Sequence, residues 1–332
     1  MTMDAPRTRV VRRPVHGVLL IDKPLGMTSN QALQKAKWLL RAEKAGHTGT
    51  LDPLASGVLP LCFGAATKFS QLQLEAPKTY EAVALLGVTT STGDAEGKVL
   101  ERKPVDLAAL NPERLSEVQA QFTGPIRQVP PMHSALKKDG KALYEYARAG
   151  LTVERAPRDV TIHALNLALT QTDQAQAAIK IIVTCSKGTY IRTLGEDIGA
   201  ALGCGAHLVF LRRLDTGGIG VQRCLTLEQL EALDDDARLA HLEPPDVLLA
   251  NHARVTLDND NAGRFLSGMR RRGRWEDAAA VAVYGDQPRV LLGVGHVQGG
   301  ELIPDRLLSP LEIQQIIETL PRATACGPTE AP

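Results

Sequence analysis

The sequence predicts an α+β fold in two parts, and three observations support this prediction. Strand-like and helix-like segments are mixed without the regular strand–helix–strand period of a parallel α/β protein. The 332 residues exceed the usual length of one domain. Near the C-terminus, short apolar segments alternate with glycines, as in a small β-rich module. We therefore expect domains at 16–245 and 250–316, with a basic tail at 1–15 and a C-terminal tail at 317–332.

Apolar periodicity and capping residues predict the individual elements. Thr28 and Ser29 would cap a helix that reaches Leu40, and Asn111 followed by Pro112 would begin another that ends near Phe122. Apolar segments predict strands at 17–22, 79–88, 160–169, 177–186, 281–284 and 289–297, and further helices are expected at 141–150, 188–203 and 226–233. Glycine and proline content predicts irregular structure at 46–60, 91–99 and 123–137, and a linker at 243–253.

Composition excludes several classes of protein. A net charge of +1 argues against a uniformly basic protein that coats nucleic acid. No apolar run approaches the length of a transmembrane helix, and the basic N-terminus lacks the apolar stretch of a signal peptide. The five cysteines form no CxxC pair, which favours a reducing cytoplasm over a disulfide scaffold or a zinc ribbon.

Charge is segregated along the chain although its sum is near zero. Residues 1–50 carry nine Lys and Arg against three acids, and residues 254–274 contain six arginines. Between them, residues 226–247 carry seven acids and one arginine. Local basic patches on a neutral protein favour a polyanion bound at defined places. Ordinary solvated faces are the alternative explanation.

The glycine-rich segment GHTGTLDPLASG at 46–57 carries the strongest chemical signal. Its glycines allow sharp turns and close approach to a ligand, and polar side chains surround Asp52. Asp52 could instead be a helix N-cap, because Asp is common there and Pro53 suits the first helical turn. No GK[ST] follows the glycines and no GxGxxG occurs, so a phosphate-binding loop is not expected.

A second segment offers Asp52 a partner. Tyr190 and Arg192 lie two residues apart at a helix start that Gly188 introduces. A buried carboxylate needs a cation to stay ionised, and arginine is always charged. Elsewhere, CGAH at 204–207 has zinc-like spacing but lacks a second pair of ligands, so no metal site is expected.

Six motifs occur in an order that resembles one known family. They are GVLLIDKPLGMTS, GHTGTLDPLASGVLP, KTYEA, QVPPMHSALK, KGTYIRTL and CGAHLVFLRRL. Together, over about residues 16–235, they resemble the TruB family of tRNA pseudouridine synthases, which make pseudouridine at uridine 55 in the T-loop of tRNA. The resemblance implies a catalytic fold with a central mixed or antiparallel sheet flanked by helices. The C-terminal residues resemble the small PUA-like RNA-binding domain that many bacterial members carry.

The resemblance also implies roles for particular residues. Asp52 falls on the family's catalytic nucleophile, and Arg192 would pair with it. Tyr80 matches the tyrosine that stacks on the target uracil, while Tyr190 and Leu211 match parts of the pocket wall.

Three further positions match residues around the site. His47 falls on the histidine that enters the T-loop when the target base leaves the stack. Lys23 and Pro24, in the first motif, would support the active-site loop. His133 stands where many members have tyrosine, a departure in a supporting loop that leaves the chemistry intact.

The implied reaction is the isomerisation of uridine, which involves no redox change and no energy input. We therefore expect no cofactor and no metal. The target base must leave its stack, which costs a few kcal/mol, and stacking on Tyr80 would return roughly 1–3 kcal/mol. Asp52 could attack either C1′ of the ribose or C6 of the base. Tyr80 is one candidate acceptor for the C5 proton, although a core tyrosine is the alternative interpretation.

The expected partner is tRNA through its T-arm stem-loop, and the protein is expected to be a monomer that needs no protein partner and no membrane. Two other functions compete with the enzyme. One is a non-catalytic RNA-binding or RNA-folding protein that uses the same basic segments. The other is a nucleotide-binding metabolic enzyme built on the loop at 46–57, against which the missing Lys-Ser/Thr after the glycines counts.

Overall fold

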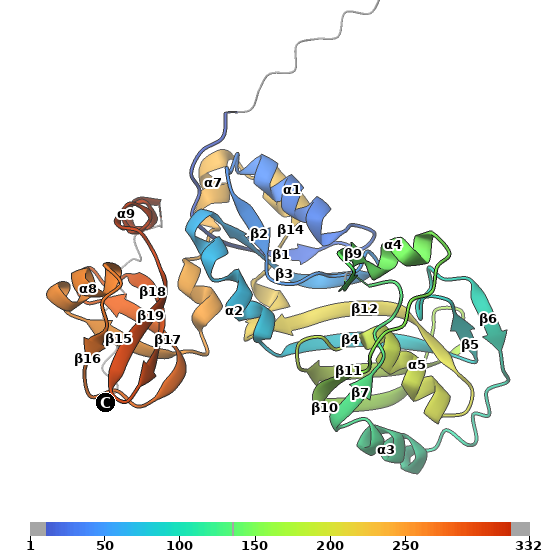
Figure 1. The fold of residues 1–332 in the computed structure, drawn as a ribbon. Coiled ribbons are helices and arrows are strands. Elements are labelled where there is room, and N and C mark those ends of the chain that lie inside the picture. The colour runs from blue at the N-terminus through green and yellow to red at the C-terminus, as the bar shows by residue number, and fades with distance from the viewer. Residues whose placement is uncertain (1–10, 135, 320–332) are drawn as a thin grey trace, which may run out of the picture.

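The computed structural model describes residues 11–134 and 136–319 and arranges them around two β-sheets (Figure 1). The larger sheet has the strand order β14-β1-β3-β12-β4-β11-β10-β7, with β13 and β2 attached to β12 and β3. The smaller sheet has the order β15-β17-β18-β19-β16. Helices and strands are mixed without a repeating period, which confirms the α+β class. Residues 1–10 and 320–332, in the expected tails, lie outside the described residues.

The strands and helices have the following bounds. The strands of the larger sheet are β1 (Gly17–Lys23), β2 (Ala45–His47), β3 (Ala55–Phe63), β4 (Lys78–Leu86), β7 (Gly124–Gln128), β10 (Arg158–Gln171), β11 (Ala177–Cys185), β12 (Ala206–Thr216), β13 (Ile219–Gly220) and β14 (Leu225–Thr226). The smaller sheet contains β15 (Ala253–Leu257), β16 (Arg271–Arg272), β17 (Ala278–Gly285), β18 (Leu291–Gln298) and β19 (Glu301–Leu307). Short pairs are formed by β5 (Val88–Thr90) with β6 (Val99–Arg102) and by β8 (Lys137–Lys138) with β9 (Lys141–Ala142). The helices are α1 (Ser29–Leu39), α2 (Ser70–Glu75), α3 (Pro112–Gln121), α4 (Leu143–Arg148), α5 (Ile191–Ala201), α6 (Leu227–Ala232), α7 (Asp235–Ala240), α8 (Asn259–Leu266) and α9 (Pro310–Thr319), with short 3-10 turns η1 (Gly64–Lys68), η2 (Val221–Arg223) and η3 (Pro245–Leu249).

The larger sheet is mixed, as expected. β1 pairs with β14 and β3 pairs with β12 in parallel, whereas β4, β11, β10 and β7 continue the sheet in antiparallel order. The main apolar core includes buried residues of α1, α5 and this sheet. β12 pairs with both β3 and β4, so the loop before β3 and the start of β4 lie near the end of β12.

The capping residues expected from the sequence begin two helices as predicted. Thr28 caps α1 by accepting a hydrogen bond from Gln31 N, and the Gln31 side chain accepts one from Thr28 N in return. Asn111 caps α3 by accepting from Arg114 N, with Pro112 in the first turn. Local side-chain chemistry therefore determines where both helices start.

The prediction of a loop at 46–60 is wrong for the second half of this segment. Residues from Ala55 onward form β3, in which every residue is buried. Pro60 is tolerated because its carbonyl accepts from Thr48 N, on the side away from β1, so the missing N–H also faces away from β1. Only residues 48–54 remain a loop, and it holds Asp52.

Two other irregular segments are also more ordered than expected. Residues 124–128 form β7, which pairs with β10 at the sheet edge. The linker expected at 243–253 is packed. Glu243 exchanges backbone hydrogen bonds with Val18, and Leu248 and Leu249 in η3 are buried.

An apolar cluster joins the two parts of the molecule, which lie side by side in Figure 1. The larger part contributes Val18, Leu20, Val58, Cys62 and Phe69, and the C-terminal part contributes Ala282, Tyr284, Leu291, Leu308 and Ile316. The Lys68 ammonium also forms an ion pair with Glu312 at 2.6 Å and donates to the Leu307 carbonyl. The C-terminal module therefore covers apolar surface of the larger part.

Candidate active site

A cavity of about 240 Å³ lies where the loop before β3 meets the start of α5 and the strands β4 and β12. Its wall includes five of the residues that the sequence singled out: Asp52, Tyr80, Tyr190, Arg192 and Leu211. These residues come from four separate parts of the chain, and the fold of the large sheet brings them together. The Asp52 loop itself is held against the start of α1, because buried Ser29 Oγ donates to the Leu51 carbonyl and accepts from Leu51 N.

Asp52 and Arg192 form an ion pair in this cavity, with 3.0 Å between Nη2 and Oδ2. The Asp52 side chain is 41% exposed, whereas the Arg192 side chain is 5% exposed. No helix follows Asp52, because Pro53 and Leu54 form a turn that leads into β3. The N-cap interpretation of Asp52 is therefore wrong, and its carboxylate is free to face the cavity.

Arg192 has a second carboxylate partner, Asp94, which sequence reasoning missed. Arg192 Nη1 lies 3.3 Å from Asp94 Oδ2, and the Asp94 side chain is 5% exposed. Arg192 also donates to the carbonyls of Thr92 and His133, so both of its terminal nitrogens have acceptors. Because His133 contributes its backbone, the side chain at this position is not needed for that bond. Asp94 lies in a loop without a distinctive pattern, and only its neighbouring threonines, which hydrogen-bond to it, could have drawn attention to it.

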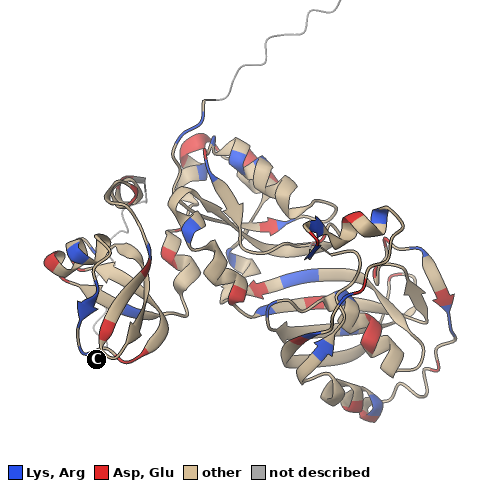
Figure 2. Cartoon of the chain, in the orientation of Figure 1, with Lys and Arg blue, Asp and Glu red and all other residues tan. Residues whose placement is uncertain are grey.

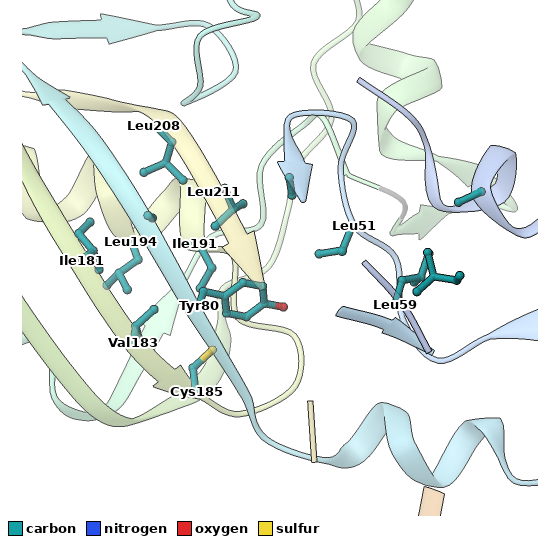
Figure 3. Packing of buried hydrophobic residues seen from close by; sticks show 14 of the residues in the cluster. Leu51, Leu59, Tyr80, Ile181, Val183, Cys185, Ile191, Leu194, Leu208 and Leu211 are labelled. Carbon is teal, nitrogen blue, oxygen red and sulfur yellow. The ribbon is translucent and has the colours of Figure 1, made fainter. Parts of the chain in front are cut away.

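Apolar and aromatic side chains form one wall of the cavity. Tyr80 on β4 is 9% exposed, and burial raises the pKa of its hydroxyl, so the side chain is neutral. Figure 3 shows the Tyr80 ring between Ile191, Cys185 and Leu211, with its hydroxyl directed toward the loop of Leu51. The backbone of Tyr190 is fixed by the side chain of Gln128, which donates to its carbonyl and accepts from its N–H. A flat ring could therefore enter between a fixed aromatic wall and the Asp52 carboxylate.

Lys23 and Pro24 do not line the cavity but lie next to its loop. Fully buried Lys23 donates to the carbonyls of Pro24 and Met27. Burial lowers the pKa of Lys23 to about 8, and the nearby charge of Asp52 partly opposes this. The Pro53 carbonyl accepts from Gly26 N, which joins the two loops directly. These contacts connect Lys23 and Pro24 to the loop that carries Asp52.

His47 also lies outside the cavity wall, on β2. Its Nδ1 is buried and has no hydrogen-bond partner within the described part of the chain, and burial together with Arg213 lowers its pKa, so the ring is neutral. Three cations that the sequence did not single out do reach the cavity: Lys78, Lys187 and Arg213. Arg213 belongs to the same motif as Leu211, and its buried position on β12 was not evident from the sequence.

The arrangement suits nucleophilic or acid–base chemistry on a bound planar group. A carboxylate oriented by a guanidinium can form a covalent intermediate. Within residues 11–134 and 136–319, no three His, Cys, Asp or Glu side chains come together in a way that could hold a metal ion. No helix in the same described ranges is long and apolar enough to span a membrane.

Three protein-family models, all of pseudouridine synthase domains, match most of the chain. Residues 37–191 match the TruB family pseudouridylate synthase N-terminal domain. Residues 192–250 match the tRNA pseudouridylate synthase B C-terminal domain, and residues 253–308 match the pseudouridine synthase II TruB C-terminal domain.

Curated relatives agree with these matches. The chain is 73% identical to tRNA pseudouridine synthase B of Verminephrobacter eiseniae (strain EF01-2), over 97% of this chain and 98% of that one. It is 58% identical to tRNA pseudouridine synthase B of Ralstonia nicotianae (strain ATCC BAA-1114 / GMI1000), over 90% and 95% of the two chains. A chain in the crystal structure of a Cbf5-Nop10-Gar1 complex has the same fold, with a TM-score of 0.66 and 24% identity over 90% of this chain and 86% of that one. The chain described here belongs to the TruB family of pseudouridine synthases.

Proposed function

We propose that this protein isomerises uridine to pseudouridine at position 55, in the T-loop of tRNA, with Asp52 as the nucleophile. The observation that carries the proposal is the Asp52–Arg192 pair at 3.0 Å in a cavity walled by Tyr80, Tyr190 and Leu211. The carboxylate is 41% exposed in a structure without RNA, so a base that enters the cavity can reach it.

The chemistry balances without any cofactor. The bond between N1 and C1′ breaks, its electron pair stays with the uracil, the ring turns, and C5 bonds to C1′. The proton on C5 is then lost and N1 gains one, so product and substrate have the same composition. Asp52 supplies the nucleophile, Arg192 orients it, and Tyr80 stacks on the extruded ring. Because the Tyr80 hydroxyl is neutral, it can take up the C5 proton only if it passes its own proton on. His47 would act outside the cavity, on the part of the T-loop that the base leaves.

The proposed partner is the T-arm stem-loop, bound by a monomer in the cytoplasm without a protein partner. Residues of both charge signs are interspersed along the chain (Figure 2), so binding would depend on local basic groups rather than on a uniform positive field. We assign catalysis to residues 16–245 and propose that the module at 250–316 is PUA-like. Its arginines at 270–274 would bind phosphates away from the target base.

The test uses tRNA transcripts that carry tritium at C5 of uridine, incubated with the full chain without ATP or any added cofactor. We expect tritium release to stop at one equivalent per tRNA. A matched transcript with cytidine at position 55 should release none. Folded protein that releases no tritium from the first transcript would contradict the proposed activity, and equal release from both would contradict the assigned position.

A further inference from the structure

The structure assigns a role in the chemistry to Arg213: we propose that its guanidinium faces the extruded uracil and stabilises the negative charge that the ring carries after its bond to C1′ has broken. The inference deepens the proposed function and rests on it.

The backbone of Arg213 is fixed between the two strands that form the cavity. On β12, Arg213 is opposite Tyr80 of β4 on one side and opposite Gly57 of β3 on the other. Gly57 has a φ of 104°, and a Cβ at this position would overlap the Arg213 carbonyl oxygen. The Arg213 side chain lies in the cavity wall, near Gly49 and Tyr80.

The side chain of Arg213 is 1% exposed, yet its hydrogen bonds are incomplete. Nε donates to the Val58 carbonyl at 2.7 Å and the guanidinium lies within hydrogen-bonding reach of the Tyr80 hydroxyl, whereas buried Nη2 has no hydrogen-bond partner among the described residues. An unpaired buried donor costs about 1–3 kcal/mol, and more when it is charged. A ligand that brings an oxygen acceptor would remove this cost.

Four other cations in the cavity wall or close to it have hydrogen-bond acceptors. Arg192 has two carboxylates and two carbonyls, Lys23 has two carbonyls, and Lys78 donates to the carbonyls of Leu74 and Ala76. Arg212, the neighbour of Arg213, is paired with Asp22 at 2.5 Å. Among these cations Arg213 alone has a buried terminal nitrogen without an acceptor, so its charge is available for a bound group.

The charges around Arg213 favour an anion. Lys78 and Lys187 line the same cavity and Lys23 lies next to its loop, while Asp52 is already paired with Arg192 and Glu75 with Lys187. When the bond from N1 to C1′ breaks, the electron pair spreads over the uracil ring onto O2 and O4. A preorganised guanidinium beside these oxygens stabilises that charge without giving up a proton, because arginine stays protonated.

The experiment compares Arg213→Gln and Arg213→Lys with Arg212→Gln, which removes a charge from the same strand but outside the cavity. Single-turnover rates at saturating tRNA and tRNA dissociation constants are measured for each. We expect Arg213→Gln to lower the rate by about 100-fold, the loss typical for one preorganised donor. Arg213→Lys should recover part of the rate, and the dissociation constant should change little.

A second substrate separates chemistry from folding. In tRNA containing 5-fluorouridine, fluorine makes the departing ring a more stable anion, so it needs less help from Arg213. The loss of N-linked fluorouridine, measured after digestion, should slow roughly tenfold less in Arg213→Gln than the reaction of uridine does. The thermal stability of each variant is measured as a control. If Arg213→Gln unfolds, the rates on uridine and fluorouridine are compared for Arg213→Lys instead.

Three results would overturn the inference while the wild-type enzyme remains active. One is an unchanged rate, and another is an equal slowing on uridine and fluorouridine, which indicates a structural role. The third is a change confined to tRNA affinity and its salt dependence, which indicates a phosphate contact. An inactive wild-type enzyme would instead contradict the proposed function itself.

Discussion

Arg192 is the residue that connects the most parts of the site. Its guanidinium joins the Asp52 loop, the Asp94 turn and the loop of His133, and it is 5% exposed. The exposed carboxylate of Asp52 is thus oriented by a group that cannot move freely. Arg213 is also buried, but its Nη2 has no acceptor among residues 11–134 and 136–319.

Two acidic side chains on α5 should make the stability of the fold depend on pH. Burial, helped by Asp197, raises the pKa of Glu196 to about 7, and burial raises that of Asp197 to about 6. The folded chain therefore binds more protons than the unfolded chain once pH exceeds the ordinary range near 4.5. The free energy of unfolding should fall as pH rises from that range to about 7.

Glu196→Gln removes this proton linkage at one of the two sites. Urea denaturation at pH 5 and pH 8 should show that the variant gains stability relative to wild type at the higher pH. A difference between variant and wild type that stays the same at both pH values would contradict the assignment.

The sequence predicts site residues well where a residue carries its own chemistry. Asp52 and Arg192 could be paired from their types alone, and the resemblance added Tyr80, Tyr190 and Leu211. Asp94 was missed because its role depends on a contact with Arg192 across 98 positions of sequence. The unpaired Nη2 of Arg213 could not be predicted, because it depends on the burial of the side chain, and a sequence motif does not show burial.

At the scale of elements, the close pairing of β3 with β12 positions the cavity. Gly57→Ala should lower the free energy of unfolding by about 2 kcal/mol or more, because a φ of 104° strains any residue with a Cβ and the Arg213 carbonyl occupies its space. Gly46→Ala is the matched control, since a Cβ there meets nothing within 4 Å. Chemical denaturation of both variants checks this, and equal losses would contradict the argument.

The elements that could be predicted are those determined by local signals. The caps of α1 and α3 begin their helices at the expected residues. Residues 55–60 of β3 look like a loop in the sequence, because Gly57 and Pro60 are rare inside strands, and only tertiary pairing explains both. In the same way, β7 forms because β10 offers it an edge.

At the scale of the whole molecule, the C-terminal module has a structural role as well as its proposed RNA contacts. A chain that ends at Asn251 would expose the apolar surface of Val18, Leu20, Val58 and Phe69. We expect a lower melting temperature and binding of an apolar dye. The prediction would be contradicted if the shortened chain bound no dye and melted at the same temperature as the larger part does within the full chain.

The proposed RNA contacts are better tested without shortening the chain. Substitution of Arg270, Arg271, Arg272 and Arg274 by glutamine should weaken tRNA binding and reduce the slope of log affinity against log salt by about one for each lost phosphate contact. The rate at saturating tRNA should stay near that of wild type, since every residue assigned to chemistry precedes Leu214. An unchanged slope would remove the RNA contact from these arginines.

The central claim is that Asp52, oriented by Arg192, is the nucleophile. Asp52→Asn has nearly the same shape, and because Asp52 caps no helix, the substitution leaves the fold intact. Tritium release from C5-labelled tRNA in a single turnover tests the claim most directly, with tRNA binding measured in parallel. The claim predicts wild-type binding and no detectable release, whereas release at a rate near that of wild type would contradict it.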